Sequence, residues 1–181
     1  MANNKPKTLD STDLAIVRAL QENARLSNKE LAAKVHLAPS SCLERARRLK
    51  ESGVLERFCT RVDPSAVGIG LQAMISIKLG GHTRENYDAF RQHALGCPEV
   101  VALYHVTGAN DFLIHIAVRD AEHLRRLIVE DLSGHAEIER LETSMILEET
   151  TRPLPIFNGA SAEAPQVRSS PRPLAFRAAG S

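Results

Sequence analysis

Residues 27–53 constrain the fold of this chain more than any other stretch, because they predict two short helices joined by a break. Ser27 is followed three residues later by Glu30, which is the spacing of a capping box that satisfies two amides at a helix start. Leu31 and Val35 then recur at helical spacing on one face, while the polar residues between them point elsewhere. The first helix is therefore predicted to be short and amphipathic.

A second helix is predicted to follow at once, since Pro39 suits the first turn of a helix and Gly53 suits the left-handed stop after it. Apolar residues at three-residue spacing form its inward face: Cys42 or Leu43, Ala46 and Leu49. Its opposite face carries short hydroxyls at the front and guanidinium groups behind: Ser40, Ser41, Glu44, Arg45, Arg47, Arg48 and Lys50. Two helices in this order form a helix-turn-helix, whose second helix can enter the major groove of DNA. The alternative is an ordinary helical hairpin with a solvated basic face.

The distribution of charge along the chain favours DNA binding. Residues 1–62 carry 12 Lys and Arg against 7 Asp and Glu, whereas residues 63–157 carry 8 against 14. Residues 158–181 carry 3 against 1, so the overall net charge of +1 hides a strong asymmetry. A basic N-terminal segment joined to an acidic body predicts polyanion contact confined to that first segment.

Other classes of protein are disfavoured by what the 181 residues lack. The three cysteines are widely spaced and form no metal-ligand motif, and the seven histidines are scattered singly, so we expect a reduced, cytoplasmic chain with no metal and no cofactor. No signal segment opens the sequence, and no apolar run approaches the roughly 18 residues of a membrane helix. Neither a nucleophilic triad nor a phosphate-binding loop is present, so an enzyme is a weak alternative.

The helix-turn-helix is predicted to lie within a winged domain spanning residues 9–62. Residues 1–8 are expected to be a flexible arm, and Asp10 caps a first helix that ends near Asn23. After Gly53, residues 54–62 alternate loosely between apolar and polar, which predicts a short strand or β-wing. Arg57 and Arg61 on this wing could reach a phosphate backbone. Residues 63–70 contain two glycines and are predicted to be a linker.

Residues 71–157 alternate strand and helix signals. Strands are predicted at residues 71–79, 100–107, 112–118 and 138–147. One helix is capped by Thr83 and stops at residues 96–98; the other is capped by Asp120 and ends at Ser133 and Gly134.

The resulting β-α-β-β-α-β order predicts an α+β, ferredoxin-like sandwich, in which two helices cover one face of a four-stranded antiparallel sheet. The bare face needs a partner, so a dimer is expected. Residues 158–181 are rich in Pro, Ser, Ala and Gly and are predicted to be a disordered tail, whose Arg168, Arg172 and Arg177 either add weak DNA contacts or are inert.

Three stretches together carry a resemblance to a known family: NARLSNKELAAKV (residues 23–35), SSCLERARRLKESGVLERF (residues 40–58) and VTGANDFLIHI (residues 106–116). The chain resembles, over residues 9–155, the Lrp/AsnC family of bacterial and archaeal transcription regulators. The segment CLERARRL (residues 42–49) is more similar to the leucine-responsive branch than to the AsnC branch.

The resemblance implies a sequence-specific DNA-binding protein that senses an amino acid or related metabolite. Such proteins dimerise through their C-terminal sheets and assemble further into tetramers, octamers or hexadecamers. Their ligand lies near a Gly-x-x-Asp hairpin between dimers. The corresponding ligand candidates here are Thr107, Gly108, Ala109, Asn110 and Asp111, with Thr143 and Ser144 as weaker ones. The Asp111 carboxylate could accept an α-ammonium group, cap backbone amides in the turn, or do both.

The chain departs from the family pattern at two positions. Ala38 stands where a capping Ser is frequent, which leaves Ser40 or Ser41 as a possible start of the recognition helix. Asn110 stands where an aromatic residue is common, which implies an altered ligand pocket or none. On double-stranded DNA, the expected contacts come from Ser40, Ser41, Arg45, Arg47, Arg48, Lys50 and Arg57. The alternative to a regulator is an architectural, nucleoid-type protein without an effector.

Overall fold

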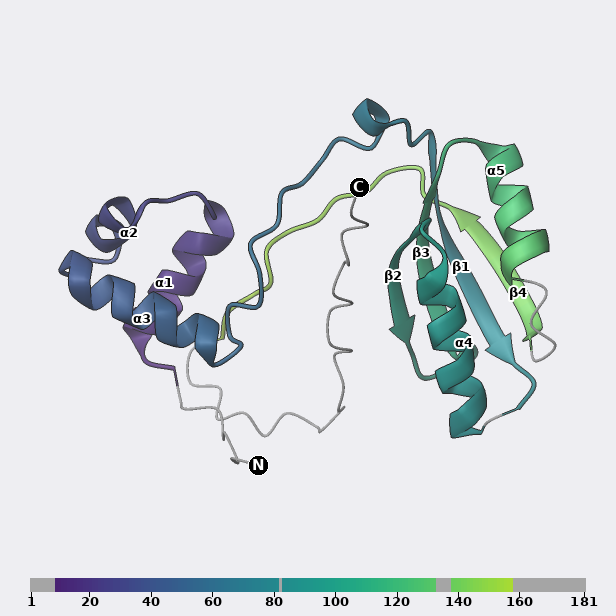
Figure 1. Ribbon diagram of the computed structural model, residues 1–181, viewed down its shortest axis with the longest axis horizontal. Helices are drawn as coiled ribbons and strands as arrows, with labels where there is room; N and C mark the ends of the chain where they lie inside the picture. Colours follow the sequence, from purple (N-terminus) through teal and green to yellow (C-terminus); the bar gives the residue numbers. More distant parts are fainter. Residues whose placement is uncertain (1–8, 82, 133–137, 158–181) are drawn as a thin grey trace, which may run out of the picture. The chain divides into compact units, whose positions relative to one another are not determined.

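The computed structural model describes residues 9–81, 83–132 and 138–157, which divide into two compact units (Figure 1). Residues 60–151 form one unit, and the described residues before and after them form the other. The predicted arm at residues 1–8 and the predicted tail at residues 158–181 lie outside the described residues.

The N-terminal unit consists of helices α1 (Ser11–Glu22), α2 (Asn28–Lys34) and α3 (Pro39–Glu51). Asp10 caps α1 by accepting a hydrogen bond from the backbone amide of Asp13, and both halves of the capping box between Ser27 and Glu30 are present. The predicted helix starts are therefore confirmed. The three helices enclose a small core of Ile16, Ala19, Leu20, Leu31, Ala32, Cys42 and Leu49.

Helix α3 begins at Pro39 and not at Ser40 or Ser41. Ala38 is the N-cap residue, with the extended backbone usual at that position, but it has no side-chain acceptor for the free amides of the first turn. Proline at the first helical position has the right φ and needs no partner for its nitrogen, so the helix starts there without a capping hydroxyl.

Replacing Ala38 by serine is expected to raise the free energy of unfolding of the N-terminal unit by about 0.5–1 kcal/mol, because the new hydroxyl would accept a hydrogen bond from a first-turn amide. Urea denaturation of the full chain measures the change. The matched control is Ala33→Ser, since Ala33 is also exposed but lies inside α2, where a hydroxyl cannot cap. Equal effects of the two substitutions would contradict the prediction.

The predicted strand or β-wing at residues 54–62 is wrong. The Leu55 amide bonds to the carbonyl of Leu49, but no element of regular secondary structure is formed between α3 and a short 3-10 helix, η1 (Ser65–Val67). Strand formation requires a neighbouring strand for the backbone amides and carbonyls. Among the described residues, no strand pairs with this segment, although the apolar-polar alternation is suited to one.

The second unit contains β1 (Leu71–Leu79), α4 (Arg84–Gly96), β2 (Val100–His105), β3 (Phe112–Val118) and α5 (Ala121–Arg126), which continues into a π-helical turn, η2 (Leu127–Leu132), and then β4 (Ile138–Met145). The sheet is antiparallel with the order β2-β3-β1-β4, which confirms the ferredoxin-like prediction. Thr83 and Asp120 cap their helices as predicted. Strands β2 and β4 end two residues earlier than expected, and the predicted end of the last helix at Ser133 and Gly134 lies outside the described residues.

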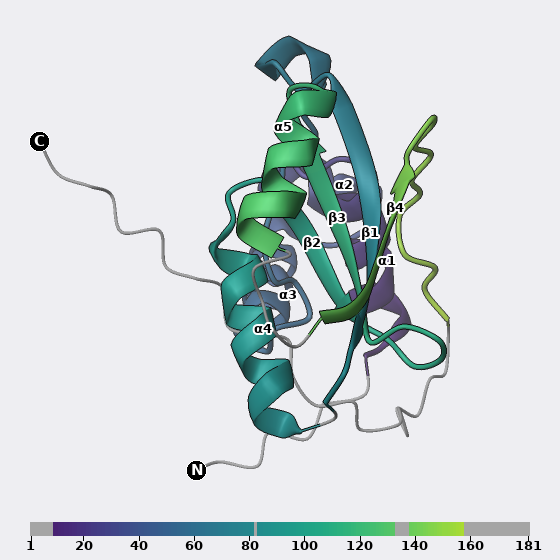
Figure 2. The same ribbon diagram turned by 90° about the vertical axis from the view of Figure 1, so that its right-hand side faces the viewer.

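Helices α4 and α5 cover one face of the sheet, as Figure 2 shows. The buried face is formed by alternate strand residues packed on the two helices: Ala73, Ile75, Ile77, Leu79, Phe112, Ile114, Ile116 and Val118. The residues between them face the other way, and Met74, Leu113 and His115 are only half-buried there. Among the described residues of this unit, no helix covers this second face of the sheet.

Candidate DNA-binding surface and effector loop

Two of the arginines expected to contact DNA pair with acidic residues of their own unit. Arg45 Nη1 lies 2.6 Å from Asp10 Oδ2 and 2.8 Å from Asp13 Oδ1, and Arg48 Nη2 lies 3.0 Å from Asp13 Oδ2. Asp13 is only 4% exposed. The hydrogen bond from Arg45, with that from the Asp13 amide, lowers the pKa of Asp10 below its ordinary value. Asp10 and Asp13 therefore join α1 to α3 by a set of ion pairs.

The other predicted contact residues of α3 face solvent. Ser40, Ser41, Arg47 and Lys50 are exposed. Arg47 Nε lies 3.3 Å from Glu51 Oε1, but both side chains are more than half exposed, and such a surface pair contributes little to stability. Its guanidinium can thus move to a phosphate or a base at small cost. Arg57 is exposed on the segment after α3.

The Gly-x-x-Asp segment connects β2 and β3, as predicted, and its acidic residue is built into the fold. Asp111 is 7% exposed. Its Oδ2 accepts a hydrogen bond from the Leu79 amide at 2.9 Å, its Oδ1 accepts one from the Tyr87 hydroxyl at 3.1 Å, and Lys78 Nζ lies 3.3 Å from Oδ2. Burial acts to raise the pKa of Asp111, but the bonds from Leu79, Lys78 and Tyr87 outweigh it and lower this pKa.

Asp111 therefore accepts a hydrogen bond from a backbone amide, but that amide is Leu79 at the end of β1 and not one of the turn, where the sequence placed it. Its role in ligand binding stays a prediction. Gly108 has φ 117°, so the turn uses a backbone conformation that favours glycine. Thr107 and Ala109 are exposed beside it.

Arg140 on β4 reaches this loop, and sequence reasoning did not identify it. One guanidinium nitrogen lies 3.2 Å from Asn110 Oδ1 and 3.4 Å from the carbonyl oxygen of Ala109. The weaker candidates on β4 lie further along the sheet, because Thr143 pairs with Ile75 and Ser144 with Met74, whereas Arg140 pairs with Lys78. The structure thus brings Arg140 to the predicted effector loop. The only sign of this in the sequence was a basic residue, Arg140, three positions before the predicted candidate Thr143 on the same strand.

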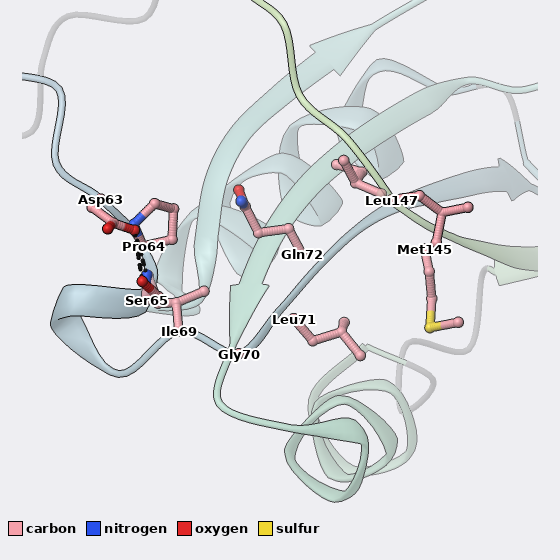
Figure 3. Close-up of a pocket in the computed structure, with 10 residues that line it drawn as sticks. Asp63, Pro64, Ser65, Ile69, Gly70, Leu71, Gln72, Met145 and Leu147 are labelled. Carbon is pink, nitrogen blue, oxygen red and sulfur yellow. Dashed lines mark hydrogen bonds between the residues drawn. The ribbon is translucent and has the colours of Figure 1, made fainter.

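An open hollow of about 440 Å³ lies at the other end of β1 (Figure 3). It is lined by residues 63–65, 69–72 and 145–147, none of which was predicted to bind ligand. Asp63 is its one charged lining residue, and Oδ1 of this carboxylate accepts hydrogen bonds from the amide and hydroxyl of Ser65. The hollow therefore offers no charged pair suited to an amino acid.

Within residues 9–81, 83–132 and 138–157, no group of His, Cys, Asp and Glu is arranged to hold a metal ion. No helix in this part of the chain is long and apolar enough to cross a membrane.

Comparison with known proteins identifies the two units. Residues 9–50 match the AsnC-type helix-turn-helix domain, and residues 72–155 match the Lrp/AsnC ligand binding domain. The chain belongs to the Lrp/AsnC family. Both matches fall in the order that the resemblance predicted, so this family assignment is confirmed.

Several Lrp/AsnC proteins are similar to it over most of their length. The HTH-type transcriptional regulator AldR of Mycolicibacterium smegmatis is 42% identical over 144 residues, which cover 80% of this chain and 84% of that protein. The transcriptional regulator AzlB of Bacillus subtilis is 37% identical, covering 82% and 96% respectively. A transcriptional regulator from Neisseria meningitidis, solved as an L-Met complex, superposes with a TM-score of 0.76 at 31% identity, covering 82% and 97%. The chain is thus a transcriptional regulator, and the enzymatic alternative is set aside.

Proposed function

We propose that this chain regulates transcription by sequence-specific DNA binding that responds to an amino acid or a related metabolite. The observation that carries the proposal is the joining of a helix-turn-helix, with exposed polar and basic residues on α3, to a Lrp/AsnC ligand binding domain. The L-Met complex of the Neisseria relative supports an amino acid as the class of effector.

In the proposed complex, α3 enters the major groove with its N-terminal half toward the base edges. Ser40, Ser41 and Arg47 contact bases or nearby phosphates there, and Lys50 and Arg57 contact the phosphate backbone. Arg48 keeps 47% of its side chain exposed and remains a candidate phosphate contact, whereas Arg45 is more enclosed by its two carboxylates.

The proposed assembly is a dimer in which the uncovered faces of two sheets pack together, with tetramers or octamers built from such dimers. Met74, Leu113 and His115 on that face are half-buried, and Tyr104 is exposed on neighbouring β2. A sheet face that no helix of its own unit covers can be buried against a second copy of itself.

The effector is proposed to bind at the turn around Gly108, where Thr107 and Ala109 are exposed and Arg140 supplies a cation for a carboxylate. Thr143 and Ser144 remain weaker candidates. Binding changes gene control only if the effector binds one assembly state more tightly than another.

The test is selection of binding sites from a random duplex library, with and without a mixture of the twenty amino acids, while the mass of the assembly is recorded by sedimentation. We expect an enriched palindromic motif whose occupancy, together with the assembly mass, changes with the mixture. As a control, Arg125→Ala is expected to give the same motif and the same response as the wild-type chain. Arg125 is exposed on α5 and pairs only with nearby Glu122 among the contacts observed.

Two results would contradict the proposal. If neither the occupancy of the motif nor the mass of the assembly changes with any amino acid, the effector part of the proposal is wrong and the chain is a constitutive regulator. Binding without any enriched motif would establish the architectural alternative, for which the replacement of an aromatic residue by Asn110 in the effector loop is the supporting feature.

A further inference from the structure

The outward face of α3 carries an apolar and an acidic residue near its centre, Leu43 and Glu44. Leu43 is 58% exposed, while its neighbour Cys42 is fully buried. Of the two alternatives for the inward position, the structure selects Cys42 and leaves Leu43 facing outward. Glu44 is also exposed and forms no ion pair within the described residues.

Helical geometry places these residues in one stripe. At 100° per residue, positions 40, 43, 44 and 47 share a face, which points away from buried Cys42 and Leu49. Asp13 holds Arg45 and Arg48 toward the flank that faces α1. The stripe that a groove would meet is thus Ser40, Leu43, Glu44 and Arg47.

We propose that Leu43 and Glu44 determine the operator sequence, Leu43 by contacting the methyl group of a thymine and Glu44 by accepting a hydrogen bond from the N4 amino group of a cytosine. This inference rests on the proposed DNA binding by α3. Apolar contact with the thymine methyl and carboxylate contact with cytosine N4 are the pairings that these side chains make in a major groove.

Glu44 is an acidic residue on the DNA-facing side of a basic unit. Residues 1–62 carry a net positive charge, and Arg47 and Lys50 lie within two turns of Glu44 on the same helix. A carboxylate facing DNA is repelled by the phosphates, so it weakens binding to every sequence except those that offer it a base amino group. Glu44 therefore lowers nonspecific binding and favours one base.

The experiment repeats the library selection with the full-length variants Glu44→Gln, Glu44→Ala and Leu43→Ala. Glu44→Gln is expected to change the preferred base at one position of each half-site from cytosine to adenine, because glutamine pairs with the N6 and N7 of adenine. Glu44→Ala is expected to lose about tenfold discrimination at that position. The control is Glu56→Gln, an exposed acidic residue outside α3.

Leu43 is tested on the wild-type motif by replacing each thymine in turn with deoxyuridine, which removes only the methyl group. At one thymine, the wild-type chain is expected to lose about fourfold in affinity, and Leu43→Ala is expected to show no further loss there. Circular dichroism checks that the exposed substitutions leave the fold intact.

The outcomes separate this inference from the proposed function. If the wild-type chain selects a motif and the Glu44 and Leu43 variants keep every base preference, the inference is wrong while the proposed function stands. If the wild-type chain selects no motif, sequence-specific binding itself is wrong, and the inference is overturned with it.

Discussion

Replacing Asp13 by alanine is expected to lower the free energy of unfolding of the N-terminal unit by about 2–3 kcal/mol. Asp13 is almost fully buried and accepts hydrogen bonds from both Arg45 and Arg48. Its loss leaves two guanidinium groups without their shared acceptor, which for a buried pair costs about 3–5 kcal/mol; the partial exposure of both arginines reduces that value. This effect is far larger than that of an ordinary surface charge.

The measurement is urea denaturation of the full chain combined with amide hydrogen exchange, because a chain with two units need not unfold in one step. Faster exchange should be confined to α1, α2 and α3. Glu22→Ala is the control, since its pair with Lys34 is exposed and contributes less than about 1 kcal/mol. Equal losses from the two variants would show that Asp13 does not hold α3.

A double-mutant cycle tests whether Asp13 acts through Arg48. If it does, Asp13→Ala combined with Arg48→Ala should lose less stability than the sum of the two single variants. If the losses of stability are additive, Asp13 does not act through Arg48. DNA contact would then be the only role left for Arg48.

Replacing Asp111 by asparagine is expected to lower the free energy of unfolding of the second unit by about 2–3 kcal/mol. The asparagine keeps the shape but loses the charge beside Lys78, and its NH2 group is a donor that must face either the Leu79 amide or the Lys78 ammonium, which are donors only. Asp88→Asn is the control, because Asp88 forms surface pairs within α4.

The difference between wild type and Asp111→Asn should depend on pH with a definite sign. The pKa of Asp111 is lowered in the folded chain, so its charged form stabilises the fold above the ordinary aspartate pKa of about 3.9. This contribution disappears as pH falls through the lowered folded pKa. Denaturation at pH 7 and pH 3 should therefore show a larger difference between the two chains at pH 7.

The same variant tests the ligand role of Asp111. If the carboxylate served mainly to accept an effector's ammonium group, Asp111→Asn would lose amino-acid binding and keep its stability at both pH values. A loss of stability with the effector response retained would assign Asp111 to the fold. Lys78 and Tyr87 already occupy the carboxylate, which favours the second result.

The sequence predicted what depends on neighbours along the chain. The capping box at Ser27, the first-turn proline at Pro39 and the alternation within β1 involve residues a few positions apart, so local pattern was sufficient. The element order then restricted the second unit to a ferredoxin-like sheet. The prediction of a wing at residues 54–62 was wrong because alternation of apolar and polar residues produces a strand only where a second strand is present to pair with it.

Only the tertiary structure decided the roles of individual charged residues. The sequence around Arg45 and Arg48 is the same whether their side chains face DNA or a carboxylate. Their partner Asp13 lies 32 and 35 residues earlier in the chain. Arg140 likewise reaches Asn110 across 30 residues. By itself the sequence determined the helices, the strands of the second unit, their order and the basic character of α3. Which side chains of α3 are held within the protein, and which remain available to DNA, depends on contacts between distant elements, and those exist only once the core has formed.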